Sequence, residues 1–185
     1  MDSAAKGPRF QDIPQLTHNG HYRVNIGWDY LEHWLADHQE HDPKLDLDPD
    51  FQRGYVWTPE QKTAYVEYIL RGGQSGRYLY FNCPSWMEIG RKNPRKYNDF
   101  VIVDGKQRLS AVLGFLHDEV PAFGHKFSDF EERMRITGPD FVVHVNNLAT
   151  RTQVLQWYIE MNTGGTVHTN EEIARVKALL ETARG

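Results

Sequence analysis

The segment best suited to chemistry spans residues 100–116, where a strand typical of a buried sheet passes through a short polar turn into a helix. Residues 100–103 are apolar and mostly β-branched, and Asp104 and Gly105 form a turn pair. A helix that begins directly after such a turn leaves its first amide groups without intrahelical partners, and its dipole favours negative charge there. The segment therefore predicts a phosphate or other anion site.

Two cations strengthen this prediction, because Lys106 and Arg108 stand beside Gln107 in the first turn of the expected helix. The alternative is that Asp104 only caps the helix and that both cations are solvated. The segment is not a Walker A loop, which needs G-x-x-x-x-G-K-[ST] and therefore a second glycine ahead of the lysine.

A second motif predicts a helix that starts with a capping box. Thr58 is the expected N-cap, Pro59 the first helical residue and Gln61 the capping partner. Gln52 and Arg53 precede the cap on an extended segment, from which an arginine can reach a phosphate held by another loop. The alternative for Arg53 is an ordinary surface or ion-paired arginine.

Together these segments resemble the N-terminal domain of the GmrSD-type restriction proteins, within the broader ParB/sulfiredoxin-like superfamily. The family pattern D-G-Q-Q-R appears here as D-G-K-Q-R over residues 104–108, with a difference only at Lys106. Residues 161–173 resemble the family's later I-N-x-x-G-x-x-L-[ST]-x-x-E-[IL] element, with His168 in place of the usual apolar residue. The other residues that carry the resemblance are Phe51, Gln52, Arg53, Trp57, Gln61 and Leu109.

The resemblance implies an α+β (mixed α/β) fold of the ParB/sulfiredoxin-like type, with a small mixed sheet flanked by helices and two C-terminal helices. It also implies a nucleotide-binding domain that hydrolyses nucleoside triphosphates in a DNA-processing or restriction and defence-related system, without specifying the base. The runner-up is a non-catalytic DNA-binding or protein-interaction module. Sulfiredoxin chemistry is not expected, because Lys106 stands where those relatives carry a reactive cysteine.

The sequence ends at Gly185, without room for the H-N-H nuclease domain that restriction proteins of this family usually carry. A nuclease or nickase that uses the pocket directly is therefore the least favoured alternative. We expect a partner protein to supply any nuclease domain.

The expected roles follow the two motifs. Arg53 would neutralise charge that develops during phosphoryl transfer, Asp104 would hold Mg²⁺ through water or position the attacking water, and Gln107 would orient that water or recognise the nucleotide. The expected nucleotide-binding residues are Gln52, Gly105, Lys106, Arg108 and Asn162. The alternative for Asn162 is a helix terminator.

The charge of the protein limits the kinds of partner that it can bind. The formal net charge is −4, which argues against non-specific coating of DNA by bulk attraction. Four cations beside Trp86 and Tyr97 form a candidate DNA-binding loop, although a solvated charged loop is the slightly favoured alternative. These cations are Arg91, Lys92, Arg95 and Lys96.

The 185 residues predict one domain over 21–185 that follows a flexible tail over 1–20. No apolar run reaches about 18 residues, and the N-terminus lacks the apolar core of a signal peptide, so we expect a cytoplasmic protein. The single cysteine, Cys83, has no partner for an internal disulfide and is expected to be structural.

The hydrophobic pattern predicts the elements that position these residues. Strands are expected near 21–26, 77–81 and 141–145, and helices over 28–37 and 128–135, with a loop over 42–50. In the helix after Thr58, the side chains Tyr65, Tyr68 and Ile69 are expected to share the face that packs on the core. Two helices with capping boxes, Thr150 to Gln153 and Thr169 to Glu172, finish the sequence.

Overall fold

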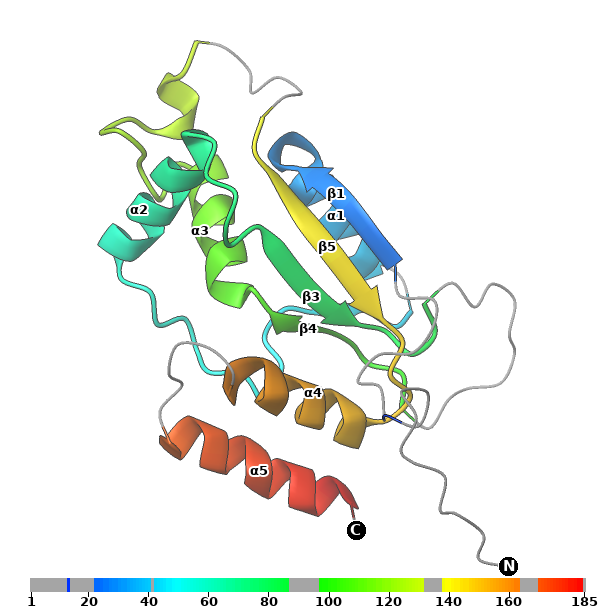
Figure 1. The fold of residues 1–185 in the computed structure, drawn as a ribbon. Helices are drawn as coiled ribbons and strands as arrows, with labels where there is room; N and C mark the ends of the chain where they lie inside the picture. The colour runs from blue at the N-terminus through cyan, green and yellow to red at the C-terminus, as the bar shows by residue number, and fades with distance from the viewer. Residues whose placement is uncertain are drawn as a thin grey trace, which may run out of the picture.

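The computed structural model describes residues 13, 22–40, 42–86, 97–131, 138–163 and 170–184 (Figure 1). The elements are β1 (Tyr22–Gly27), α1 (Trp28–Glu40), β2 (Leu45–Asp46), α2 (Pro59–Leu70), β3 (Tyr78–Asn82), β4 (Phe100–Asp104), α3 (Lys106–Leu116), the 3₁₀ turn η2 (Phe127–Asp129), β5 (Asp140–Asn146), α4 (Arg151–Thr163) and α5 (Asn170–Arg184). Helices and strands are interspersed along the described part of the chain, except that β3 is followed directly by β4 and α4 by α5. Among the described helices, none is long and apolar enough to cross a membrane.

The five strands form one mixed sheet in the order β1-β5-β3-β4-β2. The β1/β5 and β3/β4 pairs are antiparallel, whereas the β3/β5 and β2/β4 pairs are parallel. This mixed α+β architecture, with helices on both faces and two helices at the C-terminus, confirms the predicted fold class.

Two hydrophobic cores lie on opposite faces of the sheet. Phe100 and Ile102 of β4 pack into the larger core with α1, α2 and α3, while Val101 and Val103 pack into the second core with α4 and α5. Because β4 is covered on both faces, its apolar residues run without interruption. β5 alternates buried and half-buried residues, so one face of the β1, β5 and β3 region is less covered.

Two of the predicted capping boxes are present in the structure. Thr58 accepts from the Gln61 amide, and the Gln61 side chain accepts from the Thr58 amide, which completes the capping box of α2. Thr150 and Gln153 form the same reciprocal pair ahead of α4. The predicted box from Thr169 to Glu172 lies outside the described residues.

Three expectations about the elements were wrong. Tyr68 is exposed and hydrogen-bonds to Ser75, because Val66 and Ile69 already fill the core side of α2. The loop over 42–50 contains β2, which pairs with β4 at the sheet edge. In the described part of the predicted helix over 128–135, only the short turn η2 forms, and the chain is extended at Phe130.

Candidate functional site

The anion site predicted from sequence begins where β4 passes into α3. β4 ends at Asp104, and Gly105 is the N-cap of α3 in the left-handed region, with φ of 103°. A glycine N-cap supplies no side-chain acceptor, so no side-chain hydrogen bond caps α3. The alternative that Asp104 caps the helix is therefore excluded, and no capping side chain occupies the first amides of α3.

Gly105 is also required by its neighbours. A Cβ atom at this position would lie 2.4 Å from Leu79 Cδ2 and 3.2 Å from the Tyr78 carbonyl oxygen of β3. The turn therefore sits directly against β3, and only glycine allows both the positive φ and this approach.

A β-bulge aims two consecutive residues of β4 at the site. Tyr80 pairs with Asp104 and Phe81 with Ile102, so Val103 is an extra residue in the β3/β4 ladder. Val103 and Asp104 consequently both line the same cavity, although successive residues of a regular strand point to opposite faces. The bulge thus places the carboxylate of Asp104 in the pocket.

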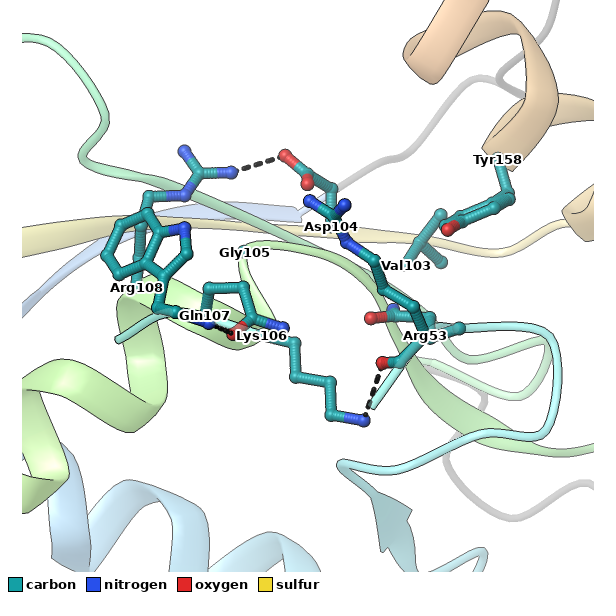
Figure 2. Close-up of a pocket in the computed structure, with 10 residues that line it drawn as sticks. Arg53, Val103, Asp104, Gly105, Lys106, Gln107, Arg108 and Tyr158 are labelled. Atoms are coloured by element: carbon teal, nitrogen blue, oxygen red, sulfur yellow. Dashed lines mark hydrogen bonds and ion pairs between the residues drawn. The ribbon is translucent and has the colours of Figure 1, made fainter. Parts of the chain in front are cut away.

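The cavity has a volume of about 400 Å³ and opens at the start of α3 (Figure 2). Segments about fifty residues apart in sequence meet in it. Its lining residues are Gln52, Arg53, Trp57, Val103, Asp104, Gly105, Lys106, Gln107, Arg108 and Tyr158. All but one of the predicted catalytic and nucleotide-binding residues are thus brought together, and the exception is Asn162.

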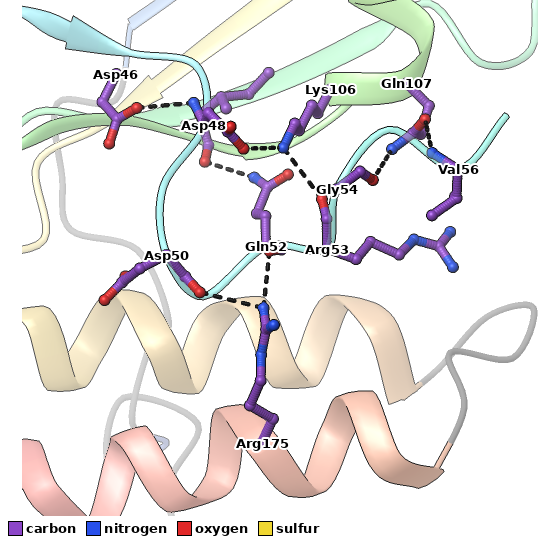
Figure 3. A network of polar contacts seen from close by, with 11 residues as sticks. Asp46, Asp48, Asp50, Gln52, Arg53, Gly54, Val56, Lys106, Gln107 and Arg175 are labelled. Carbon is purple, nitrogen blue, oxygen red and sulfur yellow. Dashed lines mark hydrogen bonds and ion pairs between the residues drawn. The ribbon is translucent and has the colours of Figure 1, made fainter.

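Gln107 ties the segment that carries Arg53 to α3. Its side-chain oxygen accepts from the amides of Val56 (3.0 Å) and Trp57 (3.2 Å), and its amide nitrogen donates to the Gly54 carbonyl (2.9 Å; Figure 3). Three bonds from one side chain hold residues 54–57 in place. The geometry makes Gln107 a positioning residue for the Arg53 segment.

The other end of this segment is fixed by the sheet and by α5. The Gln52 side chain donates to the Ile102 carbonyl at 2.6 Å, and Arg175 of α5 donates to the Gln52 carbonyl at 2.8 Å (Figure 3). Arg53 lies between these anchors and the Gln107 contacts, and its half-buried side chain extends along the cavity (Figure 2). The backbone at Arg53 is therefore held from both sides.

Lys106 and Arg108 are placed differently. The Lys106 ammonium forms an ion pair with Asp48, donates to the Arg53 carbonyl at 3.1 Å and lies 4.5 Å from the Tyr55 ring centre. Only 4 % of the surface of Lys106 is exposed, and its ammonium contacts Asp48 and the backbone of Arg53. Asp48 in turn adds to burial in raising the pKa of Tyr55.

Arg108 is half-buried at the cavity wall and forms an ion pair with Asp104, four residues earlier. A guanidinium that already faces a carboxylate presents further donors in its plane to a second anion. Arg53 and Arg108 are the two guanidinium groups among the lining residues, so the described cavity carries more positive than negative charge.

The remaining predicted residues lie elsewhere. Asn162 lies one turn after Tyr158 on α4 and donates to the Tyr158 carbonyl at 2.7 Å, within the helix and not beyond its end. Its link to the cavity runs through Tyr158, and its direct role stays a prediction. The predicted DNA-binding cations Arg91, Lys92, Arg95 and Lys96 lie outside the described residues.

Sequence reasoning missed four residues that build the site. Tyr158 lines the cavity from α4, Val103 enters it through the bulge, Asp48 binds Lys106 and Arg175 holds the Gln52 carbonyl. Asp48 stands in an Asp46-x-Asp48-x-Asp50 run, but no signal within the sequence connects that run to Lys106. The others depend on tertiary contacts that local patterns do not encode.

The described residues that line the cavity offer a single carboxylate to a metal ion. Asp104 is the one carboxylate among the described lining residues, and the described chain holds no cluster of three or more histidine, cysteine or carboxylate side chains. Mg²⁺ is commonly bound by one or two carboxylates together with substrate phosphates. Asp104, which is ion-paired with Arg108, is the lining carboxylate that could contact a Mg²⁺ ion brought by a nucleotide, and this role stays a prediction.

Comparison with known proteins gives one match. The family model described as "GmrSD restriction endonuclease, N-terminal domain" matches residues 31–142, which is more than half of the chain and includes both sequence motifs of the cavity. No curated protein and no solved structure matches.

Proposed function

The chain belongs to the family of GmrSD restriction endonuclease N-terminal domains, and from this premise we propose that it binds and hydrolyses nucleoside triphosphates within a restriction or defence-related system. The nucleotide is proposed to bind in the cavity at the start of α3. A partner nuclease domain or DNA is the proposed partner of this activity.

One observation carries this proposal, namely that Arg53 and the β4-α3 turn line the same cavity. The turn offers uncapped helix amides and a guanidinium, Arg108, from one segment. Arg53 comes from a segment that Gln107 and Lys106 fix from the α3 side. Two guanidinium groups from different segments beside a helix N-terminus are an arrangement suited to a polyphosphate.

Hydrolysis would proceed by attack of water on the terminal phosphorus, with cleavage of its bond to the bridging oxygen and release of phosphate and a proton. The α3 amides and Arg108 hold the phosphate oxygens, and Arg53 stabilises the charge that grows on them in the transition state. Asp104 would hold Mg²⁺, which when bound neutralises phosphate charge.

A phosphate-release assay tests this proposal. We expect wild-type protein with Mg²⁺ to release phosphate from at least one of ATP, GTP, CTP and UTP, and Arg53→Ala to lower kcat by about a hundredfold or more. Arg71→Gln is the matched control, because Arg71 is an exposed arginine beyond the far end of α2 that packs on Phe123.

The possible results separate the functional alternatives. Release that is lost in Arg53→Ala and kept in Arg71→Gln supports hydrolysis in this cavity. Binding without phosphate release, with or without DNA, would favour the non-catalytic module. Equal release from wild-type and Arg53→Ala protein would contradict the assignment of the site.

A further inference from the structure

An unassigned row of side chains crosses the sheet and ends at the cavity. Arg23 of β1 pairs in register with His144 of β5, His144 pairs with Tyr80 of β3, and Tyr80 pairs with Asp104 of β4. These four positions lie on adjacent strands, which Figure 1 shows side by side. The row thus leads from the outer edge of the sheet to the cavity carboxylate.

The middle of this row is aromatic. The Tyr80 ring centre lies 5.1 Å from that of His144 and 6.1 Å from that of Tyr78, and Tyr78 lies 5.6 Å from His144. The two tyrosine rings are nearly parallel, at 17°. The three rings are thus mutual neighbours, and aromatic side chains of this kind can stack a nucleobase. We call Tyr78, Tyr80 and His144 the aromatic strip.

The aromatic strip lies on the less covered face of the sheet. The neighbouring residues Leu79 and Phe81 of β3 turn to the opposite face and are fully buried beneath α1 to α3. Tyr78 by contrast is 37 % exposed, and Arg23 is exposed as well. Trp157 of α4 packs edge-on against Tyr80 at 6.0 Å and closes the strip on the α4 side. The Tyr80 ring is therefore held in place by the sheet below it and by Trp157 at its side.

Cations border the aromatic strip at both ends. Arg23 lies over the Tyr78 ring at 5.6 Å and donates to its hydroxyl at 3.3 Å. At the other end, Asp104, the register partner of Tyr80, carries the ion-paired Arg108. Burial, followed by the charge of Asp104, raises the pKa of Tyr80, so its hydroxyl is protonated at neutral pH and can donate.

We propose that the aromatic strip stacks the base of the nucleotide whose phosphates bind at the start of α3. This inference rests on the proposed function and adds where the base lies. Tyr80 and Asp104 are neighbours across a strand pair, which keeps their Cα atoms about 5 Å apart. A base on Tyr80 and His144 is thus within the reach of one nucleotide from the α3 amides, whereas a base on the helix-covered face would meet the core.

Stacking between a base and an aromatic ring is sequence-tolerant, because every base has a π-face. The aromatic strip therefore predicts a gain in affinity for all four nucleotides over a polyphosphate without a base. Tripolyphosphate carries at least as much negative charge as a nucleoside triphosphate, so phosphate contacts alone would favour tripolyphosphate.

Calorimetric titration with Mg²⁺ and ATP, GTP, CTP, UTP or tripolyphosphate tests the inference. We expect wild-type protein to bind its best nucleotide at least tenfold more tightly than tripolyphosphate. Tyr80→Leu and Tyr78→Leu should each weaken nucleotide binding, Tyr80→Leu by about tenfold. Both variants should bind tripolyphosphate within twofold of wild type.

Tyr30→Leu is the matched control, because Tyr30 is an exposed tyrosine on α1, beside His33 and across the sheet from the aromatic strip. If Tyr80→Leu fails to fold because it loses contact with Trp157, the exposed Tyr78 decides the result. Wild-type nucleotide affinity in folded Tyr78→Leu and Tyr80→Leu would overturn the inference, while retained tripolyphosphate binding would leave the phosphate site intact.

Two further results would also overturn the inference. If wild-type protein binds neither the nucleotides nor tripolyphosphate, the phosphate site and the base site are both wrong. If an eight-residue oligothymidine binds and loses affinity in the tyrosine variants while nucleotides do not, the aromatic strip binds single-stranded DNA and the inference fails.

Discussion

Lys106 and Arg108 carry the same charge and are two residues apart, but they face different partners. Lys106 is committed to Asp48 and to the Arg53 carbonyl, whereas Arg108 stands at the cavity wall with Asp104. This difference agrees with the family pattern, which has glutamine at the position of Lys106. A glutamine side chain can still donate to Asp48 or to the Arg53 carbonyl.

A charge-matched pair of variants tests these separate roles. We expect Lys106→Gln to keep nucleotide affinity within about threefold, because the lost charge was not directed at the phosphates. Arg108→Gln should lower affinity by at least about tenfold, since a charge-assisted bond to phosphate is lost. Equal losses in calorimetric titrations would show that Lys106 also binds phosphate.

Gly105 meets two structural requirements, a positive φ and the close approach of β3, and a substitution can measure the second one separately. Gly105→Ala must accept both a positive φ and a Cβ at 2.4 Å from Leu79. Gly72→Ala is the matched control, because Gly72 has φ of 87° but nothing within 4 Å of an added Cβ. We expect Gly105→Ala to lower the free energy of unfolding by about 2 kcal/mol more than Gly72→Ala in urea denaturation. Equal losses would mean that β3 yields to the new methyl group.

At the residue scale, sequence predicted which types of side chain meet but not how each is used. Gln107 is predicted to act on water or nucleotide, and in the structure its side-chain amide also holds residues 54–57. Lys106 is predicted to bind the phosphates, and in the structure its ammonium forms an ion pair with Asp48. A motif records residue types, whereas the partner of each polar group depends on chain segments about fifty residues away.

Among the contacts between elements, the proposed site depends most on the one between α3 and the Arg53 segment. If Gln107 acts by positioning Arg53, removing both side chains should cost little more than removing Arg53 alone. We therefore expect Gln107→Ala to weaken nucleotide binding in wild-type protein and to change it by less than about twofold in Arg53→Ala protein. Additive losses in this double-mutant cycle would indicate that Gln107 contacts the nucleotide itself.

The loop between α2 and β3 is held by a hydrogen bond from a titratable side chain, the phenol of Tyr65. Tyr65 of α2 is half-buried and donates to the Gly76 carbonyl at 2.8 Å, and burial raises the pKa of its phenol. Above pH of about 10, the unfolded chain releases this proton while the folded chain keeps it, so the free energy of unfolding falls as the pH rises. Below that pH the full stability is present.

Tyr65→Phe tests this linkage. The variant should lose about 1 kcal/mol of stability at pH 7 with the hydrogen bond to Gly76. It should also lose stability less steeply than wild type between pH 9.5 and 11, although Tyr97, whose pKa is likewise raised by burial, still contributes. Urea denaturation at several pH values measures both effects, and parallel pH profiles would contradict the assignment to Tyr65.

Element boundaries show where sequence patterns suffice. α2 and α4 begin at their predicted capping boxes because the capping bonds are local. β2 was missed because two residues have no periodicity, and its pairing with β4 is decided by the sheet. The outward position of Tyr68 arises because Val66 occupies the core. Helical spacing predicts a shared face without specifying which residue packs deepest.

For the whole molecule, the order of the strands explains why the site lies where it does. β4 lies between β3 and β2 and is covered by both cores, so its carboxyl end meets α3, α4 and the Arg53 segment at once. The mixed fold was expected from resemblance, and the match over residues 31–142 supports that source. The order β1-β5-β3-β4-β2 was not, because local patterns do not encode non-local strand pairing.

An amide chemical-shift titration of the labelled protein with a non-hydrolysable nucleoside triphosphate analogue and Mg²⁺ tests directly whether the nucleotide binds in this cavity. We expect the largest shifts at the amides of Gly105 to Leu109 and in the segment from Arg53 to Trp57, since both line or flank the cavity. The absence of shifts, or shifts that are concentrated away from the start of α3, would contradict the claim that this cavity binds the nucleotide.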